Sequence, residues 1–364
     1  MEFWMDGACG DPETRPVYDI RRWWDKLEEL NPDIVYQQNY GAPLRWVGNE
    51  SGYASNTSWQ TIDGQRLWDD YFVRGIEDSN YLHNGEPYIP GAENADDIVW
   101  SVPEVDVRIR SGWFYHANEE PKTPEELVKI YFDSVGLGSP LLLNVAPNRE
   151  GLIDQKDIDS LMGFRDILDN TFDVNYAEGA SAEATAVRGN HPDYAAENVT
   201  DNDYDTYWTM DDGQTTGSVT VELDEPVWMD VIEIQEYIPL GQRISSFTVD
   251  VRVNGEWMSY GEGGTIGYKR LVKGAPVMAD AVRVNITGAY AVPLLNNVSV
   301  YKADSRIEEE TMQVPGKIMA AEFQEKSGAV FAENKGPNGG GNIGGIQKGN
   351  YTGYKNVMVN QTPS

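Results

Sequence analysis

Residues 3–36 read FWMDGACGDPETRPVYDIRRWWDKLEELNPDIVY, and this stretch decides the fold of the first part of the chain. Apolar residues recur three or four apart from Ile20 to Leu30, which predicts a helix that ends at Asn31 and Pro32. A short apolar run stands on each side of that helix, at 3–5 and 33–36. A strand, a helix and a second strand in this order are typical of a parallel sheet.

The same alternation continues towards residue 172. Strands are expected at 100–109 and 141–145, and helices at 123–135 and 155–168. Thr123 and Glu126 have the spacing of a capping box at the start of the helix expected at 123–135. We therefore predict an α/β domain over residues 1–172.

The pattern changes from about residue 178, where short alternating runs replace the helical spacing. Such runs occur at 219–223, 231–235, 247–253 and 281–286, and they predict an antiparallel β-sandwich over residues 178–302. The charged, non-periodic segment 303–316 is expected to be a linker, and the glycine-rich segment 317–364 an incomplete β module. The predicted fold class is therefore multidomain, α/β plus all-β.

Composition narrows the classes of function. The chain has 364 residues, 28 Lys and Arg against 59 Asp and Glu, and a formal net charge of −31, which disfavours nucleic acid as a partner. It contains no run of about 18 apolar residues, so no membrane insertion is expected. Cys9 is the only cysteine, which excludes an intrachain disulfide and a cysteine-rich zinc site. An acidic, aromatic-rich surface suits neutral polar ligands such as sugars.

Two acids stand out as candidates for chemistry. Asp6 follows an apolar strand and precedes Gly7, a position on the catalytic rim of βα-repeat folds. Glu50 lies among aromatic residues and glycines. One nucleophile and one acid/base of this kind can cleave a glycoside, but the spacing leaves simpler alternatives open, with Asp6 capping a helix and Glu50 as one of many surface acids.

Four motifs carry a resemblance to a known family. FWMDGA at 3–8, RWVGNESGYA at 45–54, EVDVRIRSGWFYH at 104–116 and LLLNVAPNREGLI at 141–153 resemble, in order, the second half of the catalytic barrel of glycoside hydrolase family 29, the α-L-fucosidases. The resemblance is closest to the branch that cleaves α-1,3 and α-1,4 linkages of Lewis-type glycans. It implies a partial (β/α)8 barrel, and hence an incomplete and inactive fragment of a longer enzyme.

The resemblance also implies roles for individual residues. Asp6 matches the nucleophile and Glu50 the acid/base of a retaining, double-displacement mechanism that uses no cofactor. Four further positions are expected to bind substrate: Trp46, Arg110, Trp113 and His116. Trp113 would pack on the apolar face and methyl group of fucose; the simpler alternative is that Trp113 is a core residue. For Trp46 the alternative to substrate binding is a supporting position beside the pocket.

The β-sandwich resembles the discoidin-like domain that follows the barrel in this branch. Its turn at 201–208 has oxygen ligands that suit a structural calcium, with Asp203 and Thr206 as side-chain ligands. The alternative is a turn held by hydrogen bonds alone. Trp208 and Trp228 can be either sugar-binding or core residues, so the sequence leaves open whether the domain binds sugar or only braces the barrel. Residues 317–364 resemble the opening strands of family 6 carbohydrate-binding modules.

These features predict a bacterial α-1,3/1,4-fucosidase whose partner is a fucosylated oligosaccharide or a glycoprotein glycan. An extracellular or cell-surface location rests on the resemblance alone. Two alternatives stay open. The chain can be a non-catalytic carbohydrate-binding protein, or a hydrolase of the same fold that acts on another deoxysugar or on a galactoside.

Overall fold

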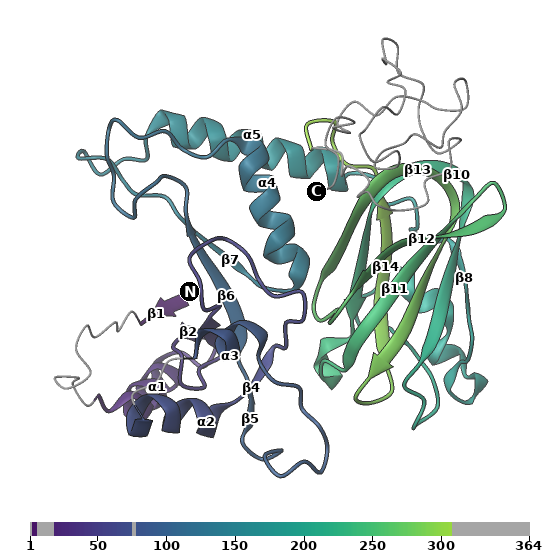
Figure 1. Cartoon of the computed structure of the whole chain (residues 1–364), viewed down its shortest axis with the longest axis horizontal. Coiled ribbons are helices and arrows are strands. Elements are labelled where there is room, and N and C mark those ends of the chain that lie inside the picture. The colour runs from purple at the N-terminus through teal and green to yellow at the C-terminus, as the bar shows by residue number, and fades with distance from the viewer. Residues whose placement is uncertain (1, 6–17, 75–77, 308–364) are drawn as a thin grey trace, which may run out of the picture. The chain divides into compact units, whose positions relative to one another are not determined.

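A computed structural model describes residues 2–5, 18–74 and 78–307, apart from the side chains of residues 72 and 73 (Figure 1). Asp6 lies outside the described residues, and so do the predicted β module at 317–364 and most of the predicted linker.

The α/β part contains a five-stranded parallel sheet, as the sequence predicted. Its strands follow the order β1, β2, β3, β6 and β7, and every neighbouring pair runs parallel. Their bounds are Glu2–Trp4, Val35–Gln37, Leu44–Trp46, Val102–Arg108 and Leu141–Asn144. In the described part of the chain the sheet has two edges, β1 and β7, and does not close into a barrel.

Three helices accompany this sheet, α1 (Ile20–Leu30), α4 (Pro124–Asp133) and α5 (Gln155–Phe172). All three were predicted within a few residues. The capping box at α4 is confirmed, because Thr123 accepts a hydrogen bond from the Glu126 amide at 3.3 Å and donates its own amide to the Glu126 carboxylate at 2.7 Å. Apolar side chains of β6 and β7 pack against α4 and α5 on one face of the sheet.

An insertion between β3 and β6 was not predicted. It contains α2 (Gly64–Trp68), a π-helical segment η2 (Asp69–Arg74), α3 (Ser79–Asn84) and an antiparallel pair of β4 (Thr61–Asp63) with β5 (Ile98–Trp100).

Arg45 of β3 fixes this insertion to the sheet. The side chain is fully buried and donates to the carbonyl oxygens of Leu82 and Trp59, each at 2.8 Å, and to that of Ser101. Burial lowers the pKa of Arg45 to about 9. A buried guanidinium satisfied by three backbone carbonyls ties together segments that lie far apart in the sequence.

The all-β part forms an antiparallel sheet of seven strands, which confirms the predicted strand type. The order is β12, β11, β13, β10, β14 and β9, with β8 also paired to β10. The strands are β8 Ser181–Ala184, β9 Trp208–Thr209, β10 Gly217–Glu236, β11 Ile244–Val253, β12 Glu256–Gly263, β13 Arg270–Ala289 and β14 Leu294–Tyr301. Register shifts interrupt the pairing of the two longest strands, which lets each bend.

The two tryptophans that the sequence left open have different environments. Trp208 is fully buried in the apolar core of the β domain and donates its indole N–H to the Ala186 carbonyl at 2.9 Å. Trp228 is 47% exposed. Trp208 is therefore a core residue, whereas Trp228 is a surface residue.

The segment before β4 also forms hydrogen bonds with the β domain. The amide of Gln60 donates to Gln242 Oε1 at 2.8 Å, and Gln242 Nε2 donates back to the Ser58 carbonyl at 2.9 Å. The amide of Ser58 donates to the Thr265 hydroxyl at 2.8 Å. Over the described ranges, no helix has the length and apolar character required to cross a bilayer.

Candidate active site

Glu50 lies in a loop that continues from the end of β3, and this loop is anchored through its backbone. The Val47 amide donates to the Glu104 carbonyl at 3.0 Å, which extends the contact between β3 and β6. Asn49 then closes the turn around Glu50, accepting from the Ser51 amide at 2.9 Å and donating to the Tyr53 carbonyl at 3.1 Å. The Glu50 side chain is 49% exposed, so a fixed backbone presents it to solvent.

His83 supports the same loop from α3. Its Nδ1 lies 3.0 Å from the Val47 carbonyl, and its ring meets that of Tyr53 edge-on at 5.6 Å. These contacts give His83 a positioning role at the Glu50 loop.

Gly48 explains why the motif before Glu50 contains a glycine. Its φ is +87°, a conformation that L side chains rarely adopt. A Cβ atom at this position would lie 2.3 Å from the Ser79 carbonyl oxygen, which is backbone and cannot rotate away. The close approach of the loop to the start of α3 therefore depends on the missing side chain.

Gly48→Ala is expected to destabilise the folded chain by about 1–3 kcal/mol and to displace Glu50, since it adds both backbone strain and a clash. Urea unfolding measures the first effect. Gly91→Ala is the matched control, because Gly91 has a φ of +80° but nothing within 4 Å of its Cβ direction. Equal losses in the two variants would show that the contact with Ser79 is not important.

Arg108 brings Glu50 and Trp113 together. One guanidinium nitrogen lies 4.0 Å from Glu50 Oε2, and the guanidinium carbon lies 5.4 Å from the centre of the Trp113 ring. Trp113 is half-buried. The candidate acid/base and the candidate sugar-stacking residue therefore lie on either side of one arginine, which the sequence analysis did not identify.

The position of Arg108 follows from the alternation of side chains along β6. Glu104, Asp106 and Arg108 share one face, which we call the inner face of the sheet. On the other face Val107 packs against α4 and α5, and Val105 packs with Val47 and Ala54. Three charged residues at every second position of a buried strand are unusual, and this spacing could have identified Arg108 from the sequence.

Two tryptophans bond to the acids of the inner face. The Trp4 indole N–H donates to Glu104 Oε2 and the Trp46 indole N–H donates to Asp106 Oδ1, both at 2.9 Å. The two acceptors are only 4% and 6% exposed. Trp46 thus supports the acids of β6, and its indole N–H is already occupied by a carboxylate.

Burial raises the pKa of Glu104 to about 7, and the neighbouring Glu2 carboxylate acts in the same direction. The folded chain therefore binds a proton here that the unfolded chain, with an ordinary glutamate, releases near pH 4.5. Because the unfolded state loses its proton first, the contribution of Glu104 to stability decreases as the pH rises through this window.

The free energy of unfolding is consequently expected to fall between pH 5 and pH 8 on account of this group. Urea unfolding at the two pH values, for the unmodified chain and for Glu104→Gln, measures the effect. The amide cannot titrate, so the variant should lose this part of the pH dependence. An identical pH dependence in both proteins would contradict the assignment.

Arg110 is only 3% exposed, and the protein binds two of its guanidinium nitrogens, whereas Nη2 lies 3.7 Å from Asp154 Oδ1 without a hydrogen bond among the described residues. Its Nε donates to Asp157 Oδ1 at 2.9 Å, and its Nη1 donates to the carbonyls of His116 and Glu119. Burial opposes the charge, but Asp157 outweighs it, so the pKa of Arg110 is raised. This geometry favours a role in positioning the loop after β6 against α5, and it exposes the His116 side chain.

The predicted calcium turn is closed by hydrogen bonds of its own. The Thr206 hydroxyl donates to Asp201 Oδ2 at 2.7 Å, and Asp203 Oδ1 accepts from the Asp205 amide at 3.0 Å. Within the described ranges, no group of three or more His, Cys, Asp or Glu side chains is arranged to hold a metal. Asp203 and Thr206 supply only part of the ligands for a Ca²⁺ ion, which takes six to eight oxygens, so backbone carbonyls and water would be needed for the rest.

A carboxylate in the loop after a strand of a parallel sheet is where βα-repeat enzymes place catalytic groups, and in this chain an antiparallel β domain follows that sheet. Residues 6–170 match the family model described as alpha-L-fucosidase, and residues 180–296 match the F5/8 type C domain. The first part of the chain is therefore similar to the α-L-fucosidases of glycoside hydrolase family 29, and the part that follows is similar to a discoidin-like domain.

Individual α-L-fucosidases are also similar to this chain. Alpha-L-fucosidase 1 of Arabidopsis thaliana is 33% identical over 304 residues, which are 82% of this chain and 58% of the relative. The solved structure of SpGH29 is 39% identical with a TM-score of 0.75, covering 83% of this chain and 64% of that one. A Ruminococcus gnavus GH29 fucosidase in complex with fucose is 32% identical with a TM-score of 0.70, covering 85% and 62%. The chain thus spans less than two thirds of the length of each.

Proposed function

We propose that this chain is the second half of the catalytic barrel, with the following β domain, of a retaining α-L-fucosidase that cleaves α-1,3 and α-1,4 linkages of Lewis-type glycans. The observation that carries the proposal is the placement of Glu50. A glycine-dependent loop presents this carboxylate to solvent, 4.0 Å from Arg108, which itself contacts Trp113. An exposed acid on a fixed backbone beside an aromatic ring suits proton transfer to a sugar.

The mechanism has two displacements. Asp6 attacks the anomeric carbon of fucose, the bond to the leaving oxygen breaks, and Glu50 gives its proton to that oxygen. Glu50, now a carboxylate, takes a proton from water, whose oxygen attacks the same carbon and releases Asp6. Fucose is released with its configuration retained, and the catalytic cycle needs no cofactor.

Trp113 is proposed to contact the apolar face of fucose, and Arg108 to orient Trp113 relative to Glu50. Arg110 contributes by holding the loop that carries Trp113, which is compatible with its burial. Trp46 is proposed to keep the inner face in place through Asp106. The exposed His116 remains available to the outer part of the glycan.

The β domain is proposed to brace the catalytic part, which is supported by the hydrogen bonds of residues 58–60 with Gln242 and Thr265. The proposed location, extracellular or at the cell surface of a bacterium, fits a fucosylated oligosaccharide or glycoprotein glycan as substrate. The rest of the barrel would be supplied by sequence upstream of the chain.

Calcium at the Asp203 turn is the remaining part of the proposal. Calcium bound there would raise the melting temperature of the chain, and EDTA would remove the increase. Asp203→Asn should abolish the response. A melting temperature that is the same in calcium and in EDTA would leave the turn held by its own hydrogen bonds.

Linkage preference is tested with the chain extended upstream to the length of its relatives. Lewis a and Lewis x trisaccharides should release fucose faster than 2′-fucosyllactose, which carries an α-1,2 linkage, by at least roughly tenfold in kcat/KM. Equal rates would contradict the α-1,3/1,4 assignment. Binding of all three glycans without any release would instead favour the non-catalytic carbohydrate-binding alternative.

A further inference from the structure

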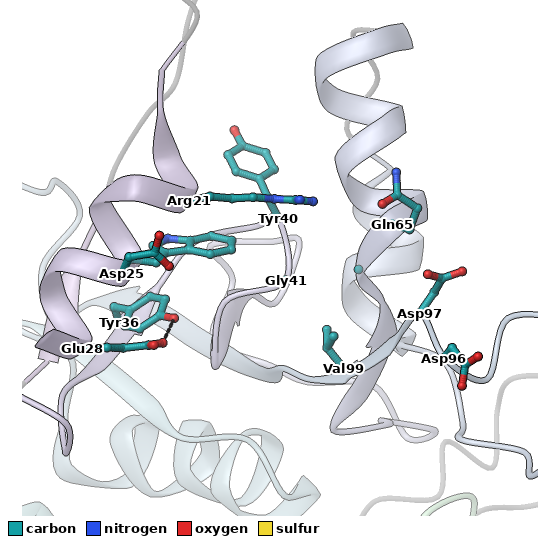
Figure 2. A pocket seen from close by; sticks show the side chains of 12 residues that line it. Arg21, Asp25, Glu28, Tyr36, Tyr40, Gly41, Gln65, Asp96, Asp97 and Val99 are labelled. Atoms are coloured by element: carbon teal, nitrogen blue, oxygen red, sulfur yellow. Dashed lines mark hydrogen bonds between the residues drawn. The ribbon is translucent and has the colours of Figure 1, made fainter.

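A second candidate site lies between α1 and the start of α2. It is a cavity of about 360 Å³, and Figure 2 shows two walls around it. Arg21, Asp25 and Tyr40 lie on one side, and Gln65 and Asp97 lie on the other. The mechanism uses none of these residues.

The chain path explains why this space is hollow. Parallel neighbours usually need a crossover of a dozen or more residues, most often a helix that covers the sheet. Strands β2 and β3 are parallel neighbours joined by residues 38–43 alone, so no helix of their own covers them. Two glycines line the cavity, and a Cβ on Gly41, whose φ is +101°, would lie 3.5 Å from the Gly64 Cα.

The cavity lies on the opposite face of the sheet from the candidate active site. Trp4, which bonds to Glu104 on the inner face, pairs with Gln37 of β2. Tyr36 precedes Gln37 and therefore faces outward, where its side chain lines the cavity. A ligand in this cavity would not compete directly for the Glu50 site.

The lining combines aromatic rings with hydrogen-bonding groups. The rings of Trp24 and Tyr36 have centres 5.6 Å apart with an interplanar angle of 32°. The Trp24 indole N–H is buried without a hydrogen-bond partner among the described residues. Tyr36 donates its hydroxyl to Glu28 at 2.7 Å, and burial together with Glu28 raises its pKa, so the phenol stays protonated (Figure 2).

Carboxylates line both sides of the cavity. Asp96 and Asp97 are exposed, as are Asp25 and the Gln65 amide. In the described part of the chain, no side-chain hydrogen bond or ion pair engages the carboxylates of Asp25, Asp96 or Asp97. Carboxylate and amide oxygens accept hydrogen bonds from hydroxyl groups, whereas an aromatic ring covers the apolar face of a pyranose.

We propose that this cavity binds one sugar unit of an oligosaccharide, outside the catalytic centre. The aromatic wall would pack on the sugar ring, and the Asp97 carboxylate with the Gln65 amide oxygen would accept hydrogen bonds from the hydroxyl groups of the sugar. Such a site would hold a glycan on the protein between cleavage events and would bind sugars that carry no fucose.

The test measures binding of N-acetyllactosamine by saturation-transfer difference NMR and by titration, with the chain as it stands. The double variant Asp97→Asn/Gln65→Ala should weaken binding by roughly fivefold or more, since it removes two exposed hydrogen-bonding groups, and Trp24→Ala should weaken it further. Trp23→Ala is the matched control, because Trp23 neighbours Trp24 on α1, is 45% exposed and does not line the cavity.

The outcomes separate this site from the catalytic one. Binding that survives Trp113→Ala and is lost in the double variant supports the cavity. Binding lost in Trp113→Ala and unchanged in the double variant, or no binding at all, would overturn the proposal. Binding of glucosamine oligomers alone, weakened by salt, would also overturn it by showing a site for cations. None of these results depends on fucose release.

Discussion

Asp6→Asn is expected to lower fucose release by at least ~10³-fold in the chain extended to the length of its relatives. A neutral amide cannot form the covalent intermediate with the sugar, so the loss should fall on kcat for every substrate. Initial rates on a Lewis-type trisaccharide measure it. Asp11→Asn, an acid in the same stretch of sequence, is the control and should keep most of the activity.

The nucleophile assignment has a clear contrary result. A loss of less than about tenfold in a folded Asp6→Asn protein would show that another group attacks the sugar, because residual catalysis from binding alone cannot supply turnover at that level. The similarity of the chain to the family would stand, but the residue would be wrong.

Glu50→Gln is expected to have the second largest effect, and its size should depend on the leaving group. Natural glycans need a proton on the departing oxygen and should lose about 10²–10⁴-fold in kcat, which is the range of general acid catalysis. Aryl fucosides with good leaving groups should lose less in the first step. Added azide should partly restore turnover of such substrates, since it attacks the fucosyl-enzyme without base assistance.

A control separates this chemistry from loss of charge. Glu93→Gln removes a carboxylate from an exposed position and should leave activity unchanged. If Glu50→Gln affected natural and activated substrates equally, or if azide had no effect on it, Glu50 would not be the acid/base. Arg108 would then be the next residue to examine, because it lies between Glu50 and Trp113.

Local signals in the sequence were sufficient for much of the fold. The apolar spacing at 20–30 and the capping box at Thr123 each report interactions between residues a few positions apart, and both appear in the structure. The alternation at 219–223 and 247–253 likewise predicted antiparallel strands. In each case a short-range pattern determines the element, so tertiary contacts did not override it.

The insertion between β3 and β6 has no such local signal. Its strands are three residues long, and its position depends on Arg45, whose partners Trp59, Leu82 and Ser101 are 14, 37 and 56 residues away. A single long-range hydrogen-bonding centre cannot be recognised from spacing. The same reason explains why burial of Arg110 by Asp157 was not anticipated, 47 residues apart.

The sequence suggested candidate residues for the site but not the contacts between them. The motif around Glu50 pointed to a candidate acid/base, and this role stays a prediction, whereas the glycine at position 48 has a physical reason in its close approach to Ser79. The part played by Arg108 was missed although its charge alternates with Glu104 and Asp106 along one strand. Resemblance to a family draws attention to residues with assigned roles. The alternation of charged residues along β6 would have added Arg108, the third charged residue on that face of the strand.

The most direct measurement is the anomeric form of the first product. With the chain extended upstream and a Lewis-type trisaccharide as substrate, proton NMR should detect α-L-fucose first, followed by slow mutarotation, and Asp6→Asn should release none. This result follows from two displacements, with Asp6 as nucleophile and Glu50 as acid/base. β-L-Fucose as the first product, or no fucose from a folded protein, would contradict the account.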